Sequence, residues 1–189
     1  MKRLFFLIFL LLTPCWAEQL VSAHWIDVDG DGVKERVGLR KFQEDGVTYG
    51  QLVMTDGRGD VLWEGSRKVS EFRFLGEFDK GTLEVAYSVN GSTFLIASYQ
   101  KSDVRPTKFR QFMWHDHRFV HLRDGNLLPA PQRPATFVWM DNPGASRWLE
   151  EFRGTGGGGA LKVQVMEIPG GDEEWLVRPD GNEFVLTER

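Results

Sequence analysis

Apolar and polar residues alternate along much of this chain, and such a pattern is typical of β-strands that bury one face. The run Arg36–Phe42 alternates in this way and predicts a half-buried strand. The run Leu20–Ile26, just before it, is more apolar and predicts a second strand. Similar stretches recur to the end of the chain, separated by short polar segments. The pattern therefore predicts an all-β fold.

Turn-forming residues separate these strands at short intervals and predict antiparallel hairpins. Asn-Gly and Asp-Gly pairs are favoured there because tight hairpin turns need residues that tolerate positive φ. The predicted turns are Glu44-Asp45-Gly46, Thr55–Asp60, Asn90-Gly91, His115–Arg118 and Asp180-Gly181.

Two segments depart from the strand pattern. Leu128–Pro134 is rich in proline, which cannot donate a ladder hydrogen bond, and it predicts a surface crossover. In Asp141–Gly154, Trp148, Leu149 and Phe152 would share one face of a helix that ends at a glycine. This is the one short helix that we predict. The glycine-rich stretch after it, 154–159, predicts a flexible loop.

The first 17 residues have the composition of a secretory signal peptide. Met1-Lys2-Arg3 is basic, Leu4–Leu12 is apolar, and Ala17 offers a small residue for cleavage. The apolar run is shorter than the roughly 20 residues that a membrane span needs, so we predict no transmembrane segment. We expect cleavage after Ala17 and a periplasmic or secreted protein. The alternative is a lipoprotein anchored through Cys15.

Residues 18–189 are predicted to form a single domain, because 172 residues are enough to bury a sizeable core. Cleavage would remove the only cysteine, so no disulfide supports this domain. Without Lys2 and Arg3 the chain has 21 basic and 27 acidic residues, a net charge of −6. This balance argues against nucleic acid as a partner, since nucleic-acid-binding domains are usually basic.

The segment Asp27–Glu35 carries four carboxylates within nine residues. Its three aspartates alternate, which directs their carboxylates to one side of a tight turn, and Gly32 permits the positive φ of that turn. Oxygen ligands in a flexible loop suit calcium, and without a cation the carboxylates would repel one another. We therefore predict a calcium site that is mainly structural. Its predicted ligands are Asp27, Asp29, Asp31, the Val33 carbonyl and Glu35.

The chain also shows signs of internal repetition. Glu77–Glu84 aligns on the acidic loop with one deletion, about 50 residues later, but lacks a counterpart of Asp31. We predict that this second copy holds no ion tightly. Near the end of the chain, Leu176–Glu188 aligns without gaps on Leu52–Glu64, and both read as strand, Asp-Gly turn and strand.

The segment Trp25–Val37 resembles the FG-GAP (integrin-α-like) repeat family, in which an apolar lead precedes a D-x-D-x-D-G-x-x-[DE] loop and a strand. The resemblance implies structural calcium bound at the positions listed above. The family usually folds as a seven-bladed propeller, which needs a longer chain. We therefore expect an antiparallel, hairpin-rich repeat fold, either a partial FG-GAP-like propeller or a β-sandwich. An EF-hand fits less well, because strands flank the loop and Gly38 occupies its twelfth position.

Other motifs have simpler explanations. His115, His117 and His121 could suggest zinc, but polar residues are expected in a hairpin turn. Arg58-Gly59-Asp60 spells an integrin-recognition tripeptide within a turn that already favours glycine and aspartate. The tryptophans of the strand patterns are expected to pack in the core, with a sugar-stacking surface as the alternative. These tryptophans are Trp63, Trp114, Trp139 and Trp175.

Together these features predict an exported, calcium-stabilised β protein with a structural or binding role. We find no nucleophile motif and no catalytic carboxylate pair outside the acidic loop, so we do not predict an enzyme. The alternatives are a carbohydrate-binding module or carbohydrate-active enzyme, and an envelope-associated accessory lipoprotein. The sequence leaves open whether the partner is a protein or a glycan, and what the oligomeric state is.

Overall fold

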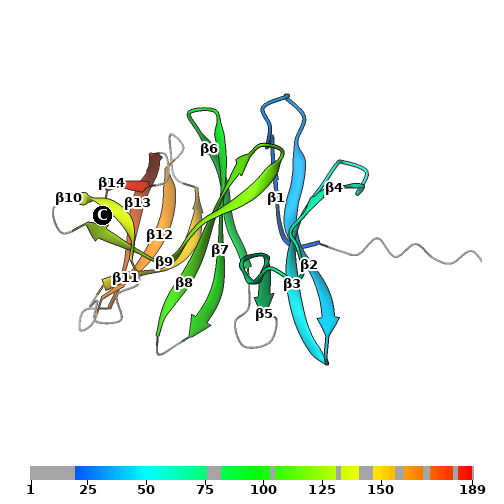
Figure 1. Cartoon of the computed structure of the whole chain (residues 1–189). Helices are drawn as coiled ribbons and strands as arrows, with labels where there is room; N and C mark the ends of the chain where they lie inside the picture. The colour runs from blue at the N-terminus through cyan, green and yellow to red at the C-terminus, as the bar shows by residue number, and fades with distance from the viewer. Residues whose placement is uncertain are drawn as a thin grey trace, which may run out of the picture.

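Antiparallel strands account for most of the structure, a computed structural model that describes residues 20–75, 82–102, 105–130, 133–140, 147–155, 160–167, 171–180 and 183–188. Within these ranges the all-β prediction is confirmed. The strands form two sheets, one of five strands and one of nine (Figure 1).

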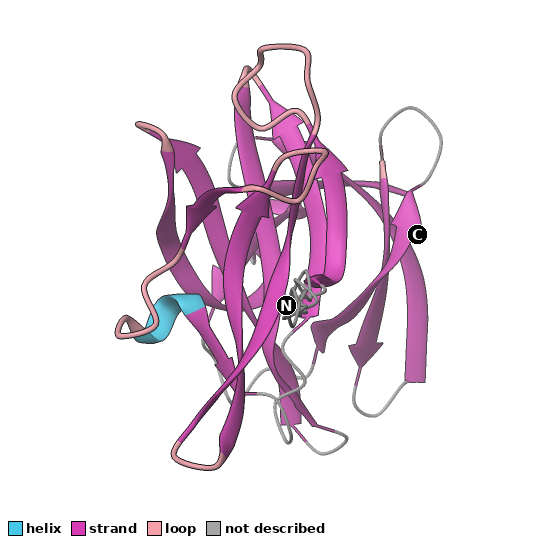
Figure 2. Ribbon diagram, turned by 90° about the vertical axis from the view of Figure 1, so that its right-hand side faces the viewer, coloured by secondary structure: helices cyan, strands magenta, loops and turns pink. Residues whose placement is uncertain are grey.

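The five-stranded sheet comes from the first part of the chain and has the order β1-β2-β3-β4, with β5 also pairing with β3. A single turn of 3₁₀-helix, η1, precedes β5 and stands out among the strands in Figure 2. The elements are β1 (Leu20–Ile26), β2 (Glu35–Glu44), β3 (Val47–Thr55), β4 (Val61–Glu64), η1 (Ser70–Phe72) and β5 (Arg73–Leu75).

The nine-stranded sheet has the order β11-β12-β13-β14-β10-β9-β8-β7-β6. Its long strand β9 pairs with β8 as far as Gly125 and with β10 from Asn126 onward. The strands are β6 (Thr82–Val89), β7 (Ser92–Ser102), β8 (Arg105–His115), β9 (Arg118–Ala130), β10 (Arg133–Met140), β11 (Arg147–Thr155), β12 (Leu161–Glu167), β13 (Gly171–Asp180) and β14 (Glu183–Glu188).

Three two-residue hairpin turns confirm the turn predictions made from local sequence. Asp45-Gly46 and Asn90-Gly91 have positive φ at both positions, 51° and 78° in the first and 51° and 76° in the second. Between β8 and β9, Asp116 and His117 adopt φ of 50° and 57° without a glycine. Positive φ at both central residues matches the twist of the flanking strands.

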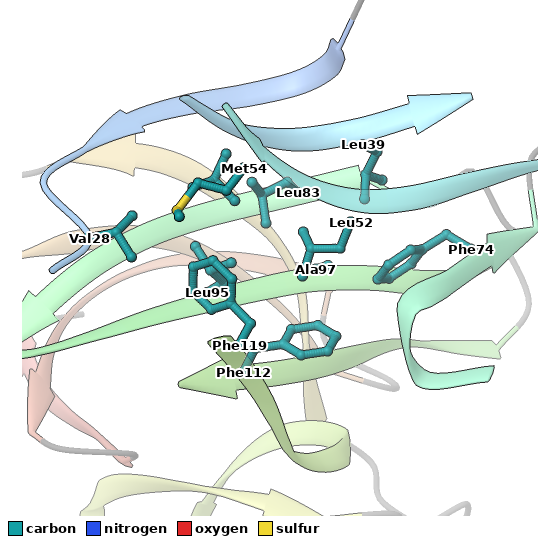
Figure 3. Close-up of a cluster of buried hydrophobic side chains, with 11 residues drawn as sticks. Val28, Leu39, Leu52, Met54, Phe74, Leu83, Leu95, Ala97, Phe112 and Phe119 are labelled. Atoms are coloured by element: carbon teal, nitrogen blue, oxygen red, sulfur yellow. The ribbon is translucent and has the colours of Figure 1, made fainter. Parts of the chain in front are cut away.

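Strands β6–β8 form a middle layer that is covered on both faces. On one face, the five-stranded sheet packs against them in the core shown in Figure 3. On the other face, the nine-stranded sheet bends back so that β12 and β13 pack against β6–β8 (Figure 1). As a result Thr93–Ser98 of β7 is buried at every position. A strand buried on both faces carries a continuous apolar run instead of an alternating one.

Two hydrophobic clusters correspond to these two interfaces. Full burial of one large apolar side chain contributes about 1.5–3 kcal/mol, so each cluster is a major source of stability. The cluster between the sheets joins Val37, Leu39, Leu52, Met54 and Phe74 to Leu83, Leu95, Ala97, Phe112 and Phe119. The second joins Val85, Tyr87, Phe94, Ile96 and Phe109 to Leu161, Val163, Val165, Trp175 and Val177.

The helix predicted in Asp141–Gly154 is wrong, because residues 147–155 form strand β11. This strand pairs with β12 and has register shifts between Leu149 and Glu151 and between Phe152 and Gly154. Each shift inserts an extra residue and breaks the period of two. The apolar residues then fall at helix-like spacings although the backbone is extended. Residues 141–146, the predicted helix start, lie outside the described residues.

The surface crossover predicted for Leu128–Pro134 is also wrong in its described part. Leu128–Ala130 belongs to β9, and Arg133 and Pro134 begin β10. Pro129 pairs with Phe137 of β10, whereas the pairing of β9 with β8 has ended by Gly125. A proline is tolerated there because β9 has a ladder on only one side at that point.

Candidate metal centre

The acidic loop connects β1 to β2, running from Asp27 to the first residue of β2, Glu35. Gly30 and Gly32 have φ of 82° and 89°, so both glycines occupy conformations that other residues rarely adopt. Gly32 was predicted to serve this purpose. The strand ends on either side are paired directly, with Ile26 opposite Glu35, so the loop is closed at its base.

Asp27 organises the loop through both of its carboxylate oxygens. Its Oδ1 accepts a hydrogen bond from the Gly30 N–H at 2.8 Å, and its Oδ2 accepts one from the Gly32 N–H at 3.0 Å. Further along, Asp29 accepts from the Asp31 N–H at 3.2 Å, and Asp31 accepts from the Val33 N–H at 2.7 Å. Short-range contacts of this kind are typical of Asx turns.

Two contacts join the loop to the core between the sheets. The Val28 side chain is 3% exposed and belongs to the cluster in Figure 3, and its N–H donates to Glu35 Oε2 at 2.8 Å. The Asp27 carbonyl accepts from Thr93 Oγ1 of β7 at 3.4 Å. The loop is thus positioned against both sheets.

Three of the four predicted carboxylate ligands converge. Asp27, Asp29 and Glu35 each offer an oxygen, and these three atoms lie within 4.8 Å of one another. Asp31 is outside this group, and the Val33 side chain is 60% exposed. The converging set is made of hard oxygen donors, which fits calcium better than a soft metal. Neighbouring negative charges at this separation also favour a cation.

The second acidic copy is described only at its end. Glu84 lies within strand β6, and residues 76–81 are outside the described residues.

The repeated hairpin at the end of the chain is described by β13 and β14, with Asp180 paired to Glu183. Its counterpart closes with Thr55 paired to Val61, so the two hairpins have turns of different length.

The three histidines do not share one environment. His115 and His117 are exposed at the turn between β8 and β9, as predicted. His121 is half-buried, and its Nε2 lies 2.6 Å from Asp124 Oδ1.

The Arg58-Gly59-Asp60 tripeptide lies in the β3–β4 turn, where Asp56 Oδ1 accepts from the N–H groups of Arg58 and Asp60. These hydrogen bonds lower the pKa of the Asp56 carboxyl, and the one from Asp60 has the larger effect.

Of the four tryptophans predicted to pack in the core, Trp63, Trp114 and Trp175 confirm the prediction, whereas Trp25, which was not among the four, is 54% exposed. Trp175 is fully buried, and its indole N–H donates to Glu173 at 2.8 Å. Trp63 and Trp114 both pack edge-to-face on Phe119, with ring centroids 5.3 and 4.9 Å apart. The side chain of Trp139 is outside the described residues.

Two features were not predicted from the sequence. An open pocket lies between residues 63–72 and residues 118–121. Beside it, the Arg110 guanidinium of β8 donates through Nη1 to the carbonyls of Ser70, Glu71 and Arg73 at 2.9, 3.3 and 2.7 Å. Both features join segments that are distant in the chain. A local sequence pattern carries no signal for them.

The fold and this loop define the chain as an antiparallel β protein with an acidic, metal-compatible loop. Comparisons with family models, with curated proteins and with solved structures give no match. Over the described ranges, no helix is long and apolar enough to cross a membrane. The predicted leader and Cys15 precede residue 20 and so lie outside the described residues.

Proposed function

We propose that this protein is an exported β domain that binds calcium at the β1–β2 loop and uses the ion to stabilise its fold, in a structural or binding role. The observation that carries the proposal is the convergence of the Asp27, Asp29 and Glu35 carboxylates within 4.8 Å. Export is supported by the basic and apolar composition of residues 1–17. The D-x-D-x-D-G-x-x-E pattern adds the FG-GAP resemblance.

In this proposal, Asp27, Asp29 and Glu35 hold the ion. Asp27 and Glu35 also accept backbone hydrogen bonds within the loop, so they serve its shape as well as its charge. A bound cation would offset the mutual repulsion of the carboxylates. Because the loop contacts both sheets, an ion that orders it would stabilise their packing as well.

The size of this effect follows from linkage. A ligand that binds only the folded state stabilises it by about 2.7 kcal/mol at a free concentration a hundred times its Kd. For a chain of this length, that corresponds to a shift of roughly 5–10 °C in the melting temperature. A shift of this size is easily measured.

The test compares the thermal unfolding of the mature chain in calcium, in magnesium and in excess chelator. We expect calcium to raise the melting temperature, and the Asp29→Asn variant to lose that response. Asp45→Asn is the matched control, because Asp45 is an exposed aspartate in the turn that follows β2, whereas the acidic loop lies at the opposite end of that strand. Equal melting temperatures with calcium and with chelator would contradict the proposal.

A further inference from the structure

The open pocket between the two sheets has a volume of about 490 Å³. Small-molecule sites commonly range over about 300–1,000 Å³, so the pocket is large enough for a ligand. One wall is the segment from the end of β4 through η1, and the other is the start of β9. The pocket is distinct from the acidic loop, whose residues do not line it.

Packed aromatic rings form the apolar part of the pocket. Trp63 lies edge-on to Phe72 and to Phe119, with ring centroids 5.5 and 5.3 Å apart. Phe72 stacks on Phe112, which is fully buried in the core of Figure 3 together with Phe119. Rings held by so many neighbours lose little freedom when a ligand binds, and such preorganisation favours affinity.

The η1 wall is held in place as well. Arg110 donates to three carbonyls around η1 and lies over the Tyr99 ring, with the guanidinium carbon 4.3 Å from the ring centroid. Glu71 faces the pocket from this wall, and its Oε2 accepts from Ser70 Oγ at 3.1 Å. The pKa of Glu71 is lowered first by a hydrogen bond from its own backbone and then by this contact with Ser70. The charges of His121 and Arg110 lower it further.

The polar groups of the pocket balance in charge. Glu64 is paired with Arg40 and His121 with Asp124, so two of the four ionisable groups in the lining are already compensated. The remaining two, Glu71 and Arg118, have opposite signs. A ligand with net charge would leave one of them uncompensated, whereas a neutral polar ligand could accept from Arg118 and donate to Glu71.

We propose that this pocket binds a neutral saccharide, with the half-buried Trp63 and Phe72 rings contacting the apolar faces of the sugar and Glu71 and Arg118 hydrogen-bonding its hydroxyl groups. A sugar hydroxyl can both donate and accept, which matches a lining of one carboxylate and one guanidinium. A sugar ring also has C–H faces that pack on aromatic side chains. An apolar ligand would instead remove water from the charged groups of Glu71 and Arg118 without offering them a hydrogen bond, which is costly.

The test is isothermal titration of the mature full-length chain with cellohexaose, xylohexaose, mannohexaose and chitohexaose, and with an acidic oligogalacturonate. Glu71→Gln and Arg118→Ala alter the polar groups of the pocket. Glu174→Gln, at an exposed glutamate of β13, and Arg58→Ala, at the exposed β3–β4 turn, are the matched controls. Thermal unfolding of every variant verifies that the fold is kept.

We expect saturable binding of at least one neutral hexasaccharide. Each pocket variant should weaken it by about tenfold, because Arg118→Ala removes a charged donor and Glu71→Gln replaces a charged acceptor with a neutral one, while the controls bind as the unaltered chain does. The proposal is overturned by the absence of binding to all four neutral sugars at millimolar concentration. Preferential binding of the acidic sugar, or binding that the pocket variants leave unchanged, would overturn it too. The titration is also made in excess chelator, so that the result for the sugar does not depend on the calcium proposal.

Discussion

Glu35 accepts a hydrogen bond from the backbone N–H of Val28 through Oε2, at 2.8 Å. Glu35 is only 6% exposed, and the Val28 side chain lies in the core between the sheets. One contact therefore joins the two ends of the acidic loop and fixes them to the core. Glu35 thus has a structural role in addition to the one we propose toward calcium.

Two substitutions of Glu35 separate these roles. Glu35→Gln keeps an oxygen acceptor for Val28, so in chelator it should be about as stable as the unaltered chain, while its response to calcium is lost. Glu35→Ala leaves a buried N–H without its partner and should cost about 1–3 kcal/mol even in chelator. Urea unfolding with and without calcium measures both. Equal stability of the two variants in chelator would rule out the structural role.

The number of ions bound follows from the two acidic copies. We expect isothermal titration to give one tight calcium per chain. The second copy is one residue shorter than the acidic loop, which changes the spacing of its carboxylates, and Glu84 lies inside β6 whereas Glu35 is the first residue of β2. Asp79→Asn should therefore leave the tight site unchanged, and Asp27→Asn should abolish it. Two tight sites of equal affinity would show that the second copy is functional.

Arg110 connects β8 to η1 through three backbone carbonyls. Its side chain is 12% exposed, so these hydrogen bonds are largely shielded from water. Hydrogen bonds to charged groups contribute roughly 1.5–3 kcal/mol, and Arg110→Ala should lower the free energy of unfolding by at least that much. Arg110→Lys should recover only part of the loss, because an ammonium group lacks the planar fork. Denaturant unfolding measures both variants, with Arg58→Ala as the exposed control.

Tyr87 gives the fold a dependence on alkaline pH. It is 7% exposed, and burial raises the pKa of its phenol far above the ordinary value of 10.0, although the hydrogen bond from Gln111 opposes this. Above pH 10 the unfolded chain loses the phenol proton and the folded chain keeps it. The contribution of this group to the free energy of unfolding is therefore fully present below pH 10. Above pH 10 it falls by about 1.4 kcal/mol per pH unit.

The Tyr87→Phe variant tests this directly. It lacks the ionisable group, so its free energy of unfolding should fall less steeply between pH 10 and pH 11 than that of the unaltered chain. Tyr49→Phe, at a half-buried tyrosine, is the control. Parallel pH profiles for Tyr87→Phe and the unaltered chain would contradict the expectation.

Local chemistry made several parts of the fold predictable. The turns at Asp45-Gly46 and Asn90-Gly91 depend on residues that tolerate positive φ, so neighbouring residues suffice to predict them. Strand β11 was mistaken for a helix because its irregular apolar spacing comes from bulges opposite β12, and a bulge is defined by the partner strand. The same holds for Pro129, whose position became acceptable only because β9 changes neighbours nearby.

The candidate site divides in the same way. The sequence predicted that Asp27, Asp29 and Glu35 belong to one site, and the structure brings a carboxylate oxygen of each within 4.8 Å of the others. Asp31 was predicted to join them but accepts the Val33 N–H outside the converging group. The pocket beside Trp63 could not be predicted, since its walls are brought together only by the packing of the two sheets.

The middle position of β6–β8 has a consequence for how the chain folds. Both outer layers bury their apolar faces against these strands, and neither layer covers the other's face. A fragment lacking either outer layer would expose one side of Leu95, Ala97, Phe94 or Ile96 to water. The two halves of the chain therefore depend on each other for cooperative unfolding. Because many of these contacts join distant segments, we expect folding to be slow for a chain of this length.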